Sequence, residues 1–499
     1  MLIRPVGSDF RIIGFYLGRV FLVVAASGLL PLAWSIAGRE WGPFSSFLLM
    51  IGVFAFLGSV MMLASRGEQR LDWGHGMVVV AVTWLVVPLI GAIPFMLSGH
   101  FSSPLDAYFD AMSGLSTTGL ALVQDLDHLA PSLNFWRHLL HFLGGQGIII
   151  AVLVLFAGGG AKTLYYGEGR EDHILPSVRS TARFIWGVAA AHLVFGVVAL
   201  GAVAYFVLGF GWIRSLFHGL MIFFAGFDTG GFAPQSTSVG YYHSALFEFV
   251  ALILMIAGVL SFAAHFALWH SSSRRALLRN LEARTILITF VSTLALVLFG
   301  LAAMNAYDEI AGLSRQGLFQ VVSAHTGTGF ATVPPTEMVR WSGLAFAGMA
   351  IAMALGGMAS STAGGIKAMR VGLTATSLRQ EIQSVLLPHG AIVDRSYFQF
   401  RSRELTPALA NTVLTMSLLY ITMYFVGAVV GVAQGVPLQQ AVFESVSAGA
   451  NVGLSVGVTN PSMSLVLEIT YIIQMWLGRL EFVAAFAFMG FLVSMVRGK

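Results

Sequence analysis

A spacing pattern that recurs four times along the chain constrains its fold more than any other feature. The pattern is Phe, three residues, Ser, five residues and Gly, and three copies keep all three residues. These copies are Phe109/Ser113/Gly119, Phe319/Ser323/Gly329 and Phe443/Ser447/Gly453, and a degenerate fourth copy is Met221/Ala225/Gly231. Each copy is a short apolar run that stops at a polar, glycine-containing tetrapeptide, between two apolar segments long enough to cross a bilayer.

Irregular, glycine-containing backbone at membrane depth requires a special environment. Unpaired backbone groups are costly in hydrocarbon, so such backbone persists only where it is buried in protein or faces a watery cavity. Glycine accepts left-handed φ angles that turn successive carbonyls towards one axis, and carbonyl oxygens can replace the water around a cation. A single glycine would more often be a helix-packing notch. Four matching copies instead predict four pore loops that line one ion pathway.

The composition is that of an integral membrane protein. Of the 499 residues 57% are hydrophobic and only 10% are charged, whereas soluble domains carry about 25% charged residues. The chain has no Cys, which excludes disulfides and thiolate metal sites. Its net charge of +4 does not indicate a nucleic-acid partner, because the basic residues fall in loops on one side of a bilayer.

The apolar segments predict an all-α integral membrane protein with ten crossings. Four pseudo-repeated helix/pore-loop/helix units surround a central pore, and two extra transmembrane helices precede them. The expected units are 1–73 (N-terminal two-helix unit), 74–157 (repeat one), 158–269 (linker and repeat two), 270–376 (repeat three, with a broken second helix) and 377–499 (linker and repeat four). We expect the second spans of repeats two and four at 243–269 and 463–495.

The distribution of basic residues orients the chain in the bilayer. With the N-terminus in the cytoplasm, 20 of the 27 Lys and Arg residues lie on the cytoplasmic side, in 1–11, 66–73, 158–183, 270–284, 367–403 and 497–499. The outer side holds five: Arg39, Arg137, Arg214, Arg315 and Arg340. The positive-inside rule therefore predicts cytoplasmic termini and four pore loops that open outwards.

The candidate ion-contacting residues lie in the four tetrapeptides 117–120, 229–232, 327–330 and 451–454. They are Thr117, Thr118, Gly119, Gly230, Gly231, Thr328, Gly329, Asn451, Val452 and Gly453. Repeat two has adjacent glycines, so either Gly230 or Gly231 supplies its filter position. No carboxylate stands at a central glycine position, which favours a dehydrated monovalent cation. Asp110 and Glu444, nine residues before their glycines, either attract cations at the pore-helix N-terminus or cap that helix.

A second glycine cluster predicts an intramembrane gate in repeat three. The segment 355–367, LGGMASSTAGGIK, interrupts an apolar helix, and glycine in a helix interior costs about 1 kcal/mol relative to Ala. The candidate gate residues are Gly356, Gly357, Ser361, Thr362, Gly364, Gly365 and Arg479. A buried arginine is expensive, so Arg479 holds the loop through its carbonyls, forms an electrostatic barrier, or snorkels. Glu481 is a candidate partner of Arg479, whereas the glycines of 143–148 are interpreted as a packing notch.

Several of these segments resemble the Trk/Ktr/HKT superfamily of potassium transporters. The similar segments are FESVSAGANVGLS, HTGTGF, STTGL, STAGGIK and WLGRLE, and the two extra N-terminal spans resemble the TrkH branch. The resemblance implies filter glycines at 119, 231, 329 and 453, a gating loop beside Arg479, and potassium selection by Gly119 where Ser would indicate sodium. It also implies a homodimer, a cytoplasmic nucleotide-binding regulatory ring resembling TrkA, and the bacterial cytoplasmic (inner) membrane as location.

The predicted function is potassium uptake through a carbonyl filter, gated by the intramembrane loop under a cytoplasmic regulatory subunit. No cofactor is expected, and the potassium ion is the transported substrate. The alternatives are a potassium-translocating subunit of a P-type ATPase and a sodium/potassium-coupled symporter of the same superfamily. The chain has no GxxxxGK[ST] loop and is not expected to be an enzyme. The candidate metal ligands His141, His218, His265 and His325 are scattered without HExxH spacing and are expected to pack between helices.

Overall fold

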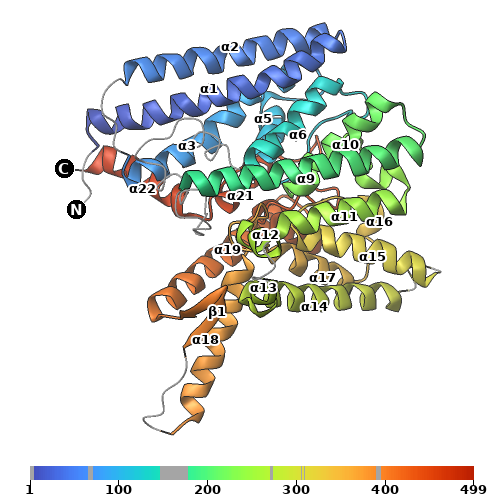
Figure 1. Cartoon of the computed structure of the whole chain (residues 1–499), viewed down its shortest axis with the longest axis vertical. Helices are drawn as coiled ribbons and strands as arrows, with labels where there is room; N and C mark the ends of the chain where they lie inside the picture. Colours follow the sequence, from blue (N-terminus) through green and yellow to red (C-terminus); the bar gives the residue numbers. More distant parts are fainter. Residues whose placement is uncertain are drawn as a thin grey trace.

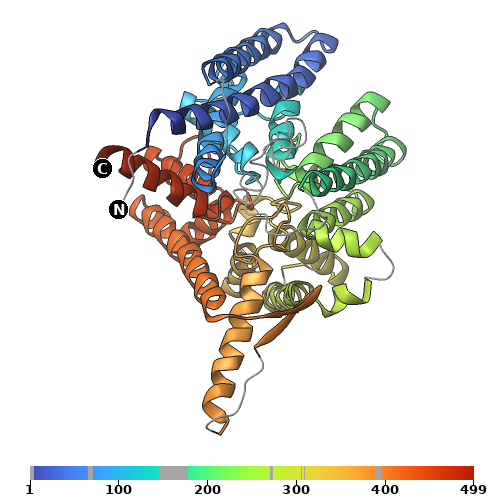
Figure 2. The same ribbon diagram turned by 60° about the vertical axis from the view of Figure 1, so that its left-hand side comes forward.

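The computed structural model describes residues 5–65, 71–146, 178–269, 274–304, 306–307, 309–388 and 395–498. This part of the chain is nearly all helical, with one antiparallel hairpin of β1 (Ser396–Gln399) and β2 (Arg401–Glu404) (Figure 1). Figure 2 shows the helices following one another in chain order around a common centre, where short irregular segments meet. The first turns of Gly7–Ala37 lie beside the last helix of the chain, where the ring centroids of Phe10 and Phe491 are 5.6 Å apart.

The helices follow the predicted order of an N-terminal pair and four helix/pore-helix/helix units. The pair is α1 (Gly7–Ala37) and α2 (Trp41–Ala64), and the first unit contains α3 (Trp73–Gly91), α4 (Ile93–Met96), α5 (Pro104–Leu115) and α6 (Pro131–Gln146). The second contains α9 (Val178–Phe206), α10 (Trp212–Phe227), the short 3-10 helix Ser238–Tyr242, α11 (Ala245–Val259) and α12 (Phe262–Trp269). The third contains α13 (Arg274–Arg279), α14 (Leu281–Ala303), α15 (Ile310–His325), α16 (Pro335–Met338), α17 (Gly343–Ala354) and α18 (Ala368–Leu386). The fourth contains α19 (Pro407–Ala433), α20 (Leu438–Gly449), α21 (Leu465–Arg479) and α22 (Val483–Arg497).

Six helical segments of the described residues are long and apolar enough to cross a membrane. They are Gly7–Ala37, Trp41–Ala64, Trp73–Met96, Ser180–Phe206, Leu281–Ala303 and Pro407–Ala433, and two bent helix pairs raise the number to as many as eight. Of the other predicted spans, 134–157 is described only to Gln146, and 341–376 is interrupted between α17 and α18. The predicted linker 158–183 lies, up to residue 177, outside the described residues.

The second spans of repeats two and four, predicted at 243–269 and 463–495, are each a pair of helices joined by a sharp bend. α11 meets α12 at 108°, and α21 meets α22 at 110°. The first bend leaves the carbonyl of Val259 to accept a hydrogen bond from the N–H of Met358, at 3.1 Å. At the second bend Glu481 and Phe482 have φ angles of 49° and 67°, which a right-handed helix cannot contain.

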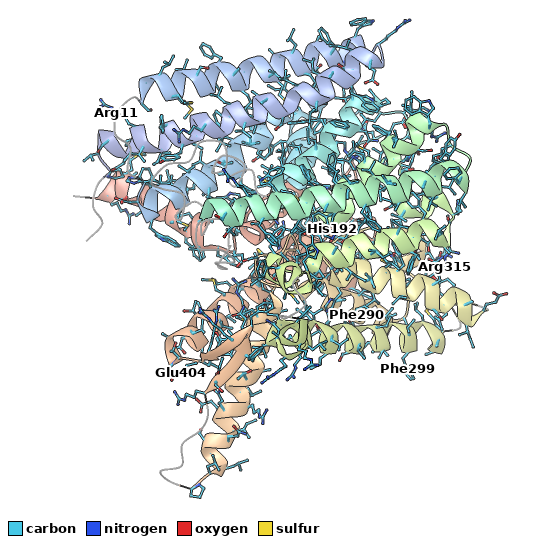
Figure 3. The ribbon with its side chains drawn as sticks, in the orientation of Figure 1. Arg11, His192, Phe290, Phe299, Arg315 and Glu404 are labelled. Atoms are coloured by element: carbon cyan, nitrogen blue, oxygen red, sulfur yellow. The ribbon has the colours of Figure 1, made fainter. Side chains whose placement is uncertain are left out.

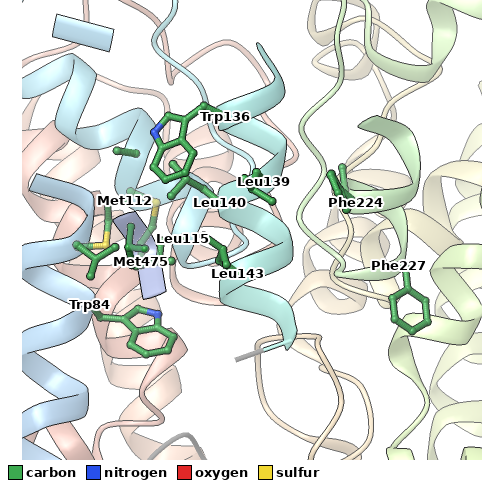
Figure 4. Close-up of a cluster of buried hydrophobic side chains, with 14 of the residues drawn as sticks. Trp84, Met112, Leu115, Trp136, Leu139, Leu140, Leu143, Phe224, Phe227 and Met475 are labelled. Atoms are coloured by element: carbon green, nitrogen blue, oxygen red, sulfur yellow. The ribbon is translucent and has the colours of Figure 1, made fainter. Parts of the chain in front are cut away.

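The outer surface of the helical body is apolar, as a bilayer requires. Phe299 on α14, labelled in Figure 3, is 69% exposed, and large aliphatic side chains are exposed along α1, α2, α9 and α19. The interior holds a continuous apolar core that joins the N-terminal pair to residues of all four repeats. Figure 4 shows the part of it around α5 and α6, where Trp84, Met112 and Trp136 are buried. The Trp136 indole donates to the Gly91 carbonyl at 2.8 Å, which satisfies its N–H.

The N-terminal pair is held together by a close crossing of two glycines. A Cβ built on Gly18 would lie 2.8 Å from the carbonyl oxygen of Gly58, and one built on Gly58 would lie 2.9 Å from the carbonyl oxygen of Gly18. Real Cβ contacts almost never come within 3.0 Å. The two backbones therefore approach directly, which is how small residues pack helices where lipid removes the hydrophobic driving force.

We expect Gly58→Val to destabilise the α1–α2 pair, because its branched side chain would overlap the α1 backbone. Overpacking of this kind costs about 1–3 kcal/mol. The measurement is the thermal unfolding midpoint of the protein in detergent, and Gly52→Val is the control, because a Cβ on Gly52 of the same helix meets nothing within 4 Å. Equal midpoints for the two variants would contradict the crossing.

Candidate functional site

The four pore helices α5, α10, α15 and α20 end in the same hydrogen-bonded turn. In each, the N–H of the residue before the pattern glycine bonds to the carbonyl of the pattern Ser or Ala five residues earlier. These bonds are Thr118–Ser113 (2.9 Å), Gly230–Ala225 (2.7 Å), Thr328–Ser323 (2.9 Å) and Val452–Ser447 (2.9 Å). With the shorter bond inside each turn they form the Schellman motif, which closes a helix with one left-handed residue. The constant Ser-to-Gly spacing is therefore the geometry of a helix end.

Left-handed residues alternate along each of the four predicted filter segments, 117–120, 229–232, 327–330 and 451–454. The residue that closes the helix has a positive φ in all four repeats: Thr117 (55°), Thr229 (50°), Gly327 (71°) and Asn451 (55°). The pattern glycines also have positive φ: Gly119 (92°), Gly231 (76°), Gly329 (85°) and Gly453 (87°). Thr117 and Thr229 are β-branched, and β-branched residues rarely have a positive φ. The backbone strain costs about 1–3 kcal/mol per residue and persists only where the surrounding structure enforces it.

The four pattern glycines meet in a closed ring. A Cβ built on each would overlap a carbonyl oxygen of the next repeat: 2.3 Å from Gly230 for Gly119, 2.2 Å from Thr328 for Gly231, 1.8 Å from Val452 for Gly329, and 2.0 Å from Thr118 for Gly453. The contacts run from repeat one to two, three, four and back to one. Any side chain at these positions would force the ring apart, so only glycine fits.

Gly231, and not Gly230, occupies the ring position of repeat two. Gly231 has the left-handed φ of the other three glycines and abuts repeat three. Gly230 contributes the carbonyl that Gly119 contacts, which is the role of Thr118, Thr328 and Val452 in the other repeats. On its other side Gly230 faces His141, whose ring would lie 2.4 Å from a Cβ at that position.

Buried acceptors in three pore helices hold the chain just beyond each ring glycine. The bonds join side-chain oxygens to N–H groups twelve residues later: Asp110 to Leu122 (3.1 Å), Gln320 to Thr332 (3.1 Å) and Glu444 to Val456 (2.9 Å). Repeat two has Ile222 at this position and, twelve residues on, Pro234, which has no N–H to bind. Asp110 and Glu444 are fully buried in the middle of their helices, so the interpretation that they cap a helix N-terminus is wrong.

A buried ion pair supports repeat one behind the ring. Nε of Arg137 lies 2.7 Å from Oδ2 of Asp110, and both side chains are almost completely excluded from solvent. The Arg137 guanidinium also stacks 4.0 Å above the ring of Phe232, the residue after Gly231. The charge count places Arg137 on the outer side of the bilayer, and the structure shows that its side chain there is buried in protein. Its position inside α6, among apolar residues, was the signal for a buried partner.

The segment 355–367 folds directly beneath the ring. A Cβ built on Gly364 would lie 2.2 Å from the carbonyl oxygen of Ala450, the residue before the filter segment of repeat four. The segment closes on itself, because the N–H of Gly356 bonds to the Ile366 carbonyl at 2.8 Å. Between it and α21 lies a cavity of about 20 Å³, lined in part by Ser360, Lys367 and Arg479. That volume holds about one water molecule.

Arg479 and Thr362 hold this segment to the filter. Arg479 donates to the Thr362 carbonyl at 2.9 Å, to Oγ1 of Thr117 at 3.3 Å and to the Gly144 carbonyl at 2.5 Å. Oγ1 of Thr362 lies 3.1 Å from the carbonyl oxygen of Phe227 and 2.9 Å from that of Gly258. Of the three interpretations of Arg479, the geometry matches the one in which it binds loop carbonyls.

Glu481, a candidate partner of Arg479, forms ion pairs at the base of the loop. It hydrogen-bonds Arg370 of α18 and lies 3.9 Å from Nζ of Lys367. Lys367 also donates to the carbonyl of Ala363 within the loop. The bend between α21 and α22 is thus tied to α18, the helix that follows the segment 355–367.

Glu282 is a further anchor that the sequence analysis missed. Its carboxylate is fully buried and accepts the N–H of Ala359 in the loop at 2.7 Å, and the amide of Gln399 in β1 at 3.4 Å. In the sequence it follows the N-cap Asn280 and has the position of an ordinary first-turn acid. No local signal distinguishes it, because both partners lie far along the chain.

Glycines of the second helices pack under the pore-helix ends. A Cβ built on Gly144 would lie 1.8 Å from the carbonyl oxygen of Leu115, which confirms the packing notch. Gly258 and Gly478 approach the carbonyls of Phe227 and Gly449 in the same way, at 2.2 and 2.1 Å.

The four candidate histidines each contact a different group. His218 hydrogen-bonds the Tyr242 hydroxyl at 2.7 Å, His265 the Ser261 carbonyl at 3.0 Å and His325 the Thr289 hydroxyl at 2.8 Å. His141 contacts two backbone groups beside the ring. Among the described residues no three His, Cys, Asp or Glu side chains are grouped to hold a metal ion.

The fold and the ring define an integral membrane protein whose four pore-loop repeats converge on one axis. The comparisons with known proteins give the family: residues 45–489 match the model of TrkH, described as a cation transport protein, so the chain belongs to the TrkH family. This confirms the family predicted from the sequence.

Relatives and a solved structure match along nearly the whole chain. An uncharacterised cation transporter of Methanocaldococcus jannaschii is 28% identical, over 96% of this chain and 95% of its own. The Trk system potassium uptake protein TrkH of Halomonas elongata is 26% identical, over 94% and 96%. The crystal structure of the potassium transporter TrkH from Vibrio parahaemolyticus has the same fold, with a TM-score of 0.80 and 23% identity over 96% of this chain and 98% of that one. The predicted fold class is confirmed.

We expect Asp110→Ala to be strongly destabilising, because it leaves the buried Arg137 guanidinium without its counter-charge. Removing one partner of a buried pair costs about 3–5 kcal/mol, and the expected result is a large fall in the thermal unfolding midpoint. The double variant Asp110→Ala/Arg137→Met should recover part of the loss. Asp125→Ala, which removes the exposed partner of His128, is the control and should leave the midpoint unchanged. An Asp110→Ala midpoint equal to that of the control would contradict the role of the pair.

Proposed function

We propose that this protein takes up potassium ions across the cytoplasmic membrane through the ring of four glycine-containing segments. The observation that carries the proposal is the closed sequence of glycine-to-carbonyl contacts, because it brings backbone oxygens of all four repeats to one axis. The name of the Halomonas elongata relative, a potassium uptake protein, supports the choice of ion.

Backbone carbonyls suit the dehydration step. The idealised Born cost of moving an ion from water into a medium of low dielectric is about 20 kcal/mol, and oxygens held around the axis replace the lost water. The ring segments offer the carbonyls of Thr118, Gly230, Thr328 and Val452 at equivalent positions. The pore helices end at this ring, so the negative ends of their dipoles favour a cation there.

The segment 355–367 acts in this proposal as the gate. It lies against the inner side of the filter segments, and Arg479 holds it there through the Thr362 carbonyl. Because α18 continues directly from the segment and carries the Arg370 contact to Glu481, a movement of α18 is transmitted to the gate.

A cytoplasmic nucleotide-binding ring resembling TrkA is the proposed regulator, and a second copy of the chain is the proposed membrane partner. The relatives' designation as parts of a Trk system supports the regulator. For the homodimer, α18 extends away from the helical body (Figures 1 and 2) and has Leu378, Ile382 and Val385 exposed on one face. In this proposal the bilayer is the inner membrane, with both termini in the cytoplasm.

The sodium/potassium-coupled symporter of the same superfamily is the second candidate. Gly119 argues against it, because a Ser side chain at this position would overlap the Gly230 carbonyl and change the ring. The P-type ATPase subunit is disfavoured by membership of the TrkH family.

We expect Gly119→Ser and Gly453→Ser to reduce the preference for potassium over sodium, because each side chain would push a carbonyl of the next repeat away from the axis. The measurement is the ratio of potassium to sodium flux into proteoliposomes. Gly435→Ser is the matched control: it has the same left-handed backbone, with φ of 86°, but no atom within 4 Å of a Cβ. Unchanged ratios in both ring variants would remove the filter assignment.

We expect Arg479→Ala to raise potassium flux in the absence of any regulator, because the gate segment loses its bond to the filter. Potassium flux driven by an imposed membrane potential measures this directly. Arg19→Ala is the control, since Arg19 also lies within a span but stacks on Phe15, 4.3 Å away, far from the gate in sequence. Arg479→Ala flux no higher than that of the control would contradict the gating role.

A further inference from the structure

His141 lies between the pore helix of repeat one and the filter segment of repeat two. Its Nδ1 is 2.7 Å from the carbonyl oxygen of Gly114, near the end of α5. Its Nε2 is 3.2 Å from the backbone N of Phe232, the residue after Gly231. The imidazole also packs against the α-carbon of Gly230 and lies 4.3 Å from the Phe232 ring, centroid to centroid. One side chain therefore contacts both neighbours of the ring glycine Gly231.

These two contacts define the protonation state of the ring. Nδ1 faces a carbonyl, which only accepts, so Nδ1 carries the proton. Nε2 faces an N–H, which only donates, so Nε2 presents a lone pair. The bridging form is thus the neutral imidazole with its proton on Nδ1, a tautomer assigned from its partners.

In three repeats a glycine of the second helix packs under the end of the pore helix: Gly144, Gly258 and Gly478. Among these three repeats, only repeat one has a bridging side chain three residues before that glycine. His141 stands three residues before Gly144, and the residues three before Gly258 and Gly478 are Met255 and Met475. A methionine side chain has no N–H donor and only a weakly accepting sulfur. The sequence pattern treats repeat two as degenerate, and its filter segment receives this additional support from the neighbouring repeat.

We propose that His141 is a positioning residue for ion selectivity, which fixes the Gly230 and Gly231 carbonyls by holding the Phe232 N–H and the Gly230 α-carbon. This inference rests on the proposed function, because it names a residue that sets the selectivity of the same filter. His141 does not itself contact the ion. It acts through the backbone of repeat two, and the Gly114 carbonyl fixes its orientation in turn.

The test compares His141→Gln with His141→Met in proteoliposomes. Gln has both a donor and an acceptor and can replace the two bonds, whereas Met has a similar length and no donor. We expect His141→Met to lower the ratio of potassium to sodium permeability by about tenfold, the order expected when a buried N–H loses its acceptor. His141→Gln should keep a ratio close to that of the unaltered protein.

The outcomes separate this inference from the proposed function. An unaltered protein that does not prefer potassium would overturn the proposed function. A potassium preference that His141→Met leaves intact would overturn the role of His141 alone. Equal loss in the Gln and Met variants would also overturn it, because the two bonds would then not be what holds the filter. Thermal unfolding of each variant shows whether it folds, and the permeability ratio is independent of how much protein is active.

Discussion

The approach of four glycines to four backbone carbonyls is the contact on which the rest of this structure depends. No side chain fits between Gly119 and Gly230, or between Gly329 and Val452, so at the ring itself the repeats meet backbone to backbone. Such backbone is tolerated at membrane depth only where protein encloses it or where it lines a cavity. The pore helices, the second-helix glycines beneath them and the buried acceptors behind them supply that enclosure.

Strain at the ring is maintained by polar contacts that lie outside it. Thr117 and Thr229 have left-handed φ angles that cost free energy. Arg479 donates a hydrogen bond to the Thr117 hydroxyl, and the hydroxyls of Thr229 and Thr362 are hydrogen-bonded to each other. The segment 355–367, the proposed gate, is thus part of the framework that holds the ring. Arg479 links this segment to Thr117 of the first filter segment, and Glu282 links it to the hairpin of β1 and β2.

Local patterns could be predicted from the sequence, and contacts between distant segments could not. The Ser-to-Gly spacing predicts the filter segments because a Schellman turn involves only neighbouring residues, and the glycines of 355–367 indicate a break for the same reason. The bends after Val259 and Arg479, and the burial of Arg137, depend on Met358, Arg370 and Asp110, which no local pattern connects to them. The bonds of Asp110 and Glu444 could not be predicted because their partners lie twelve and more residues away, beyond the helix end.

The most direct test of convergence is the position of a bound ion. A structure determined with rubidium, with its anomalous scattering measured, locates the ion independently of any transport assay. We expect density on the axis between the carbonyls of Thr118, Gly230, Thr328 and Val452. Ordered rubidium bound elsewhere in a protein that transports it, with none at this ring, would contradict the account.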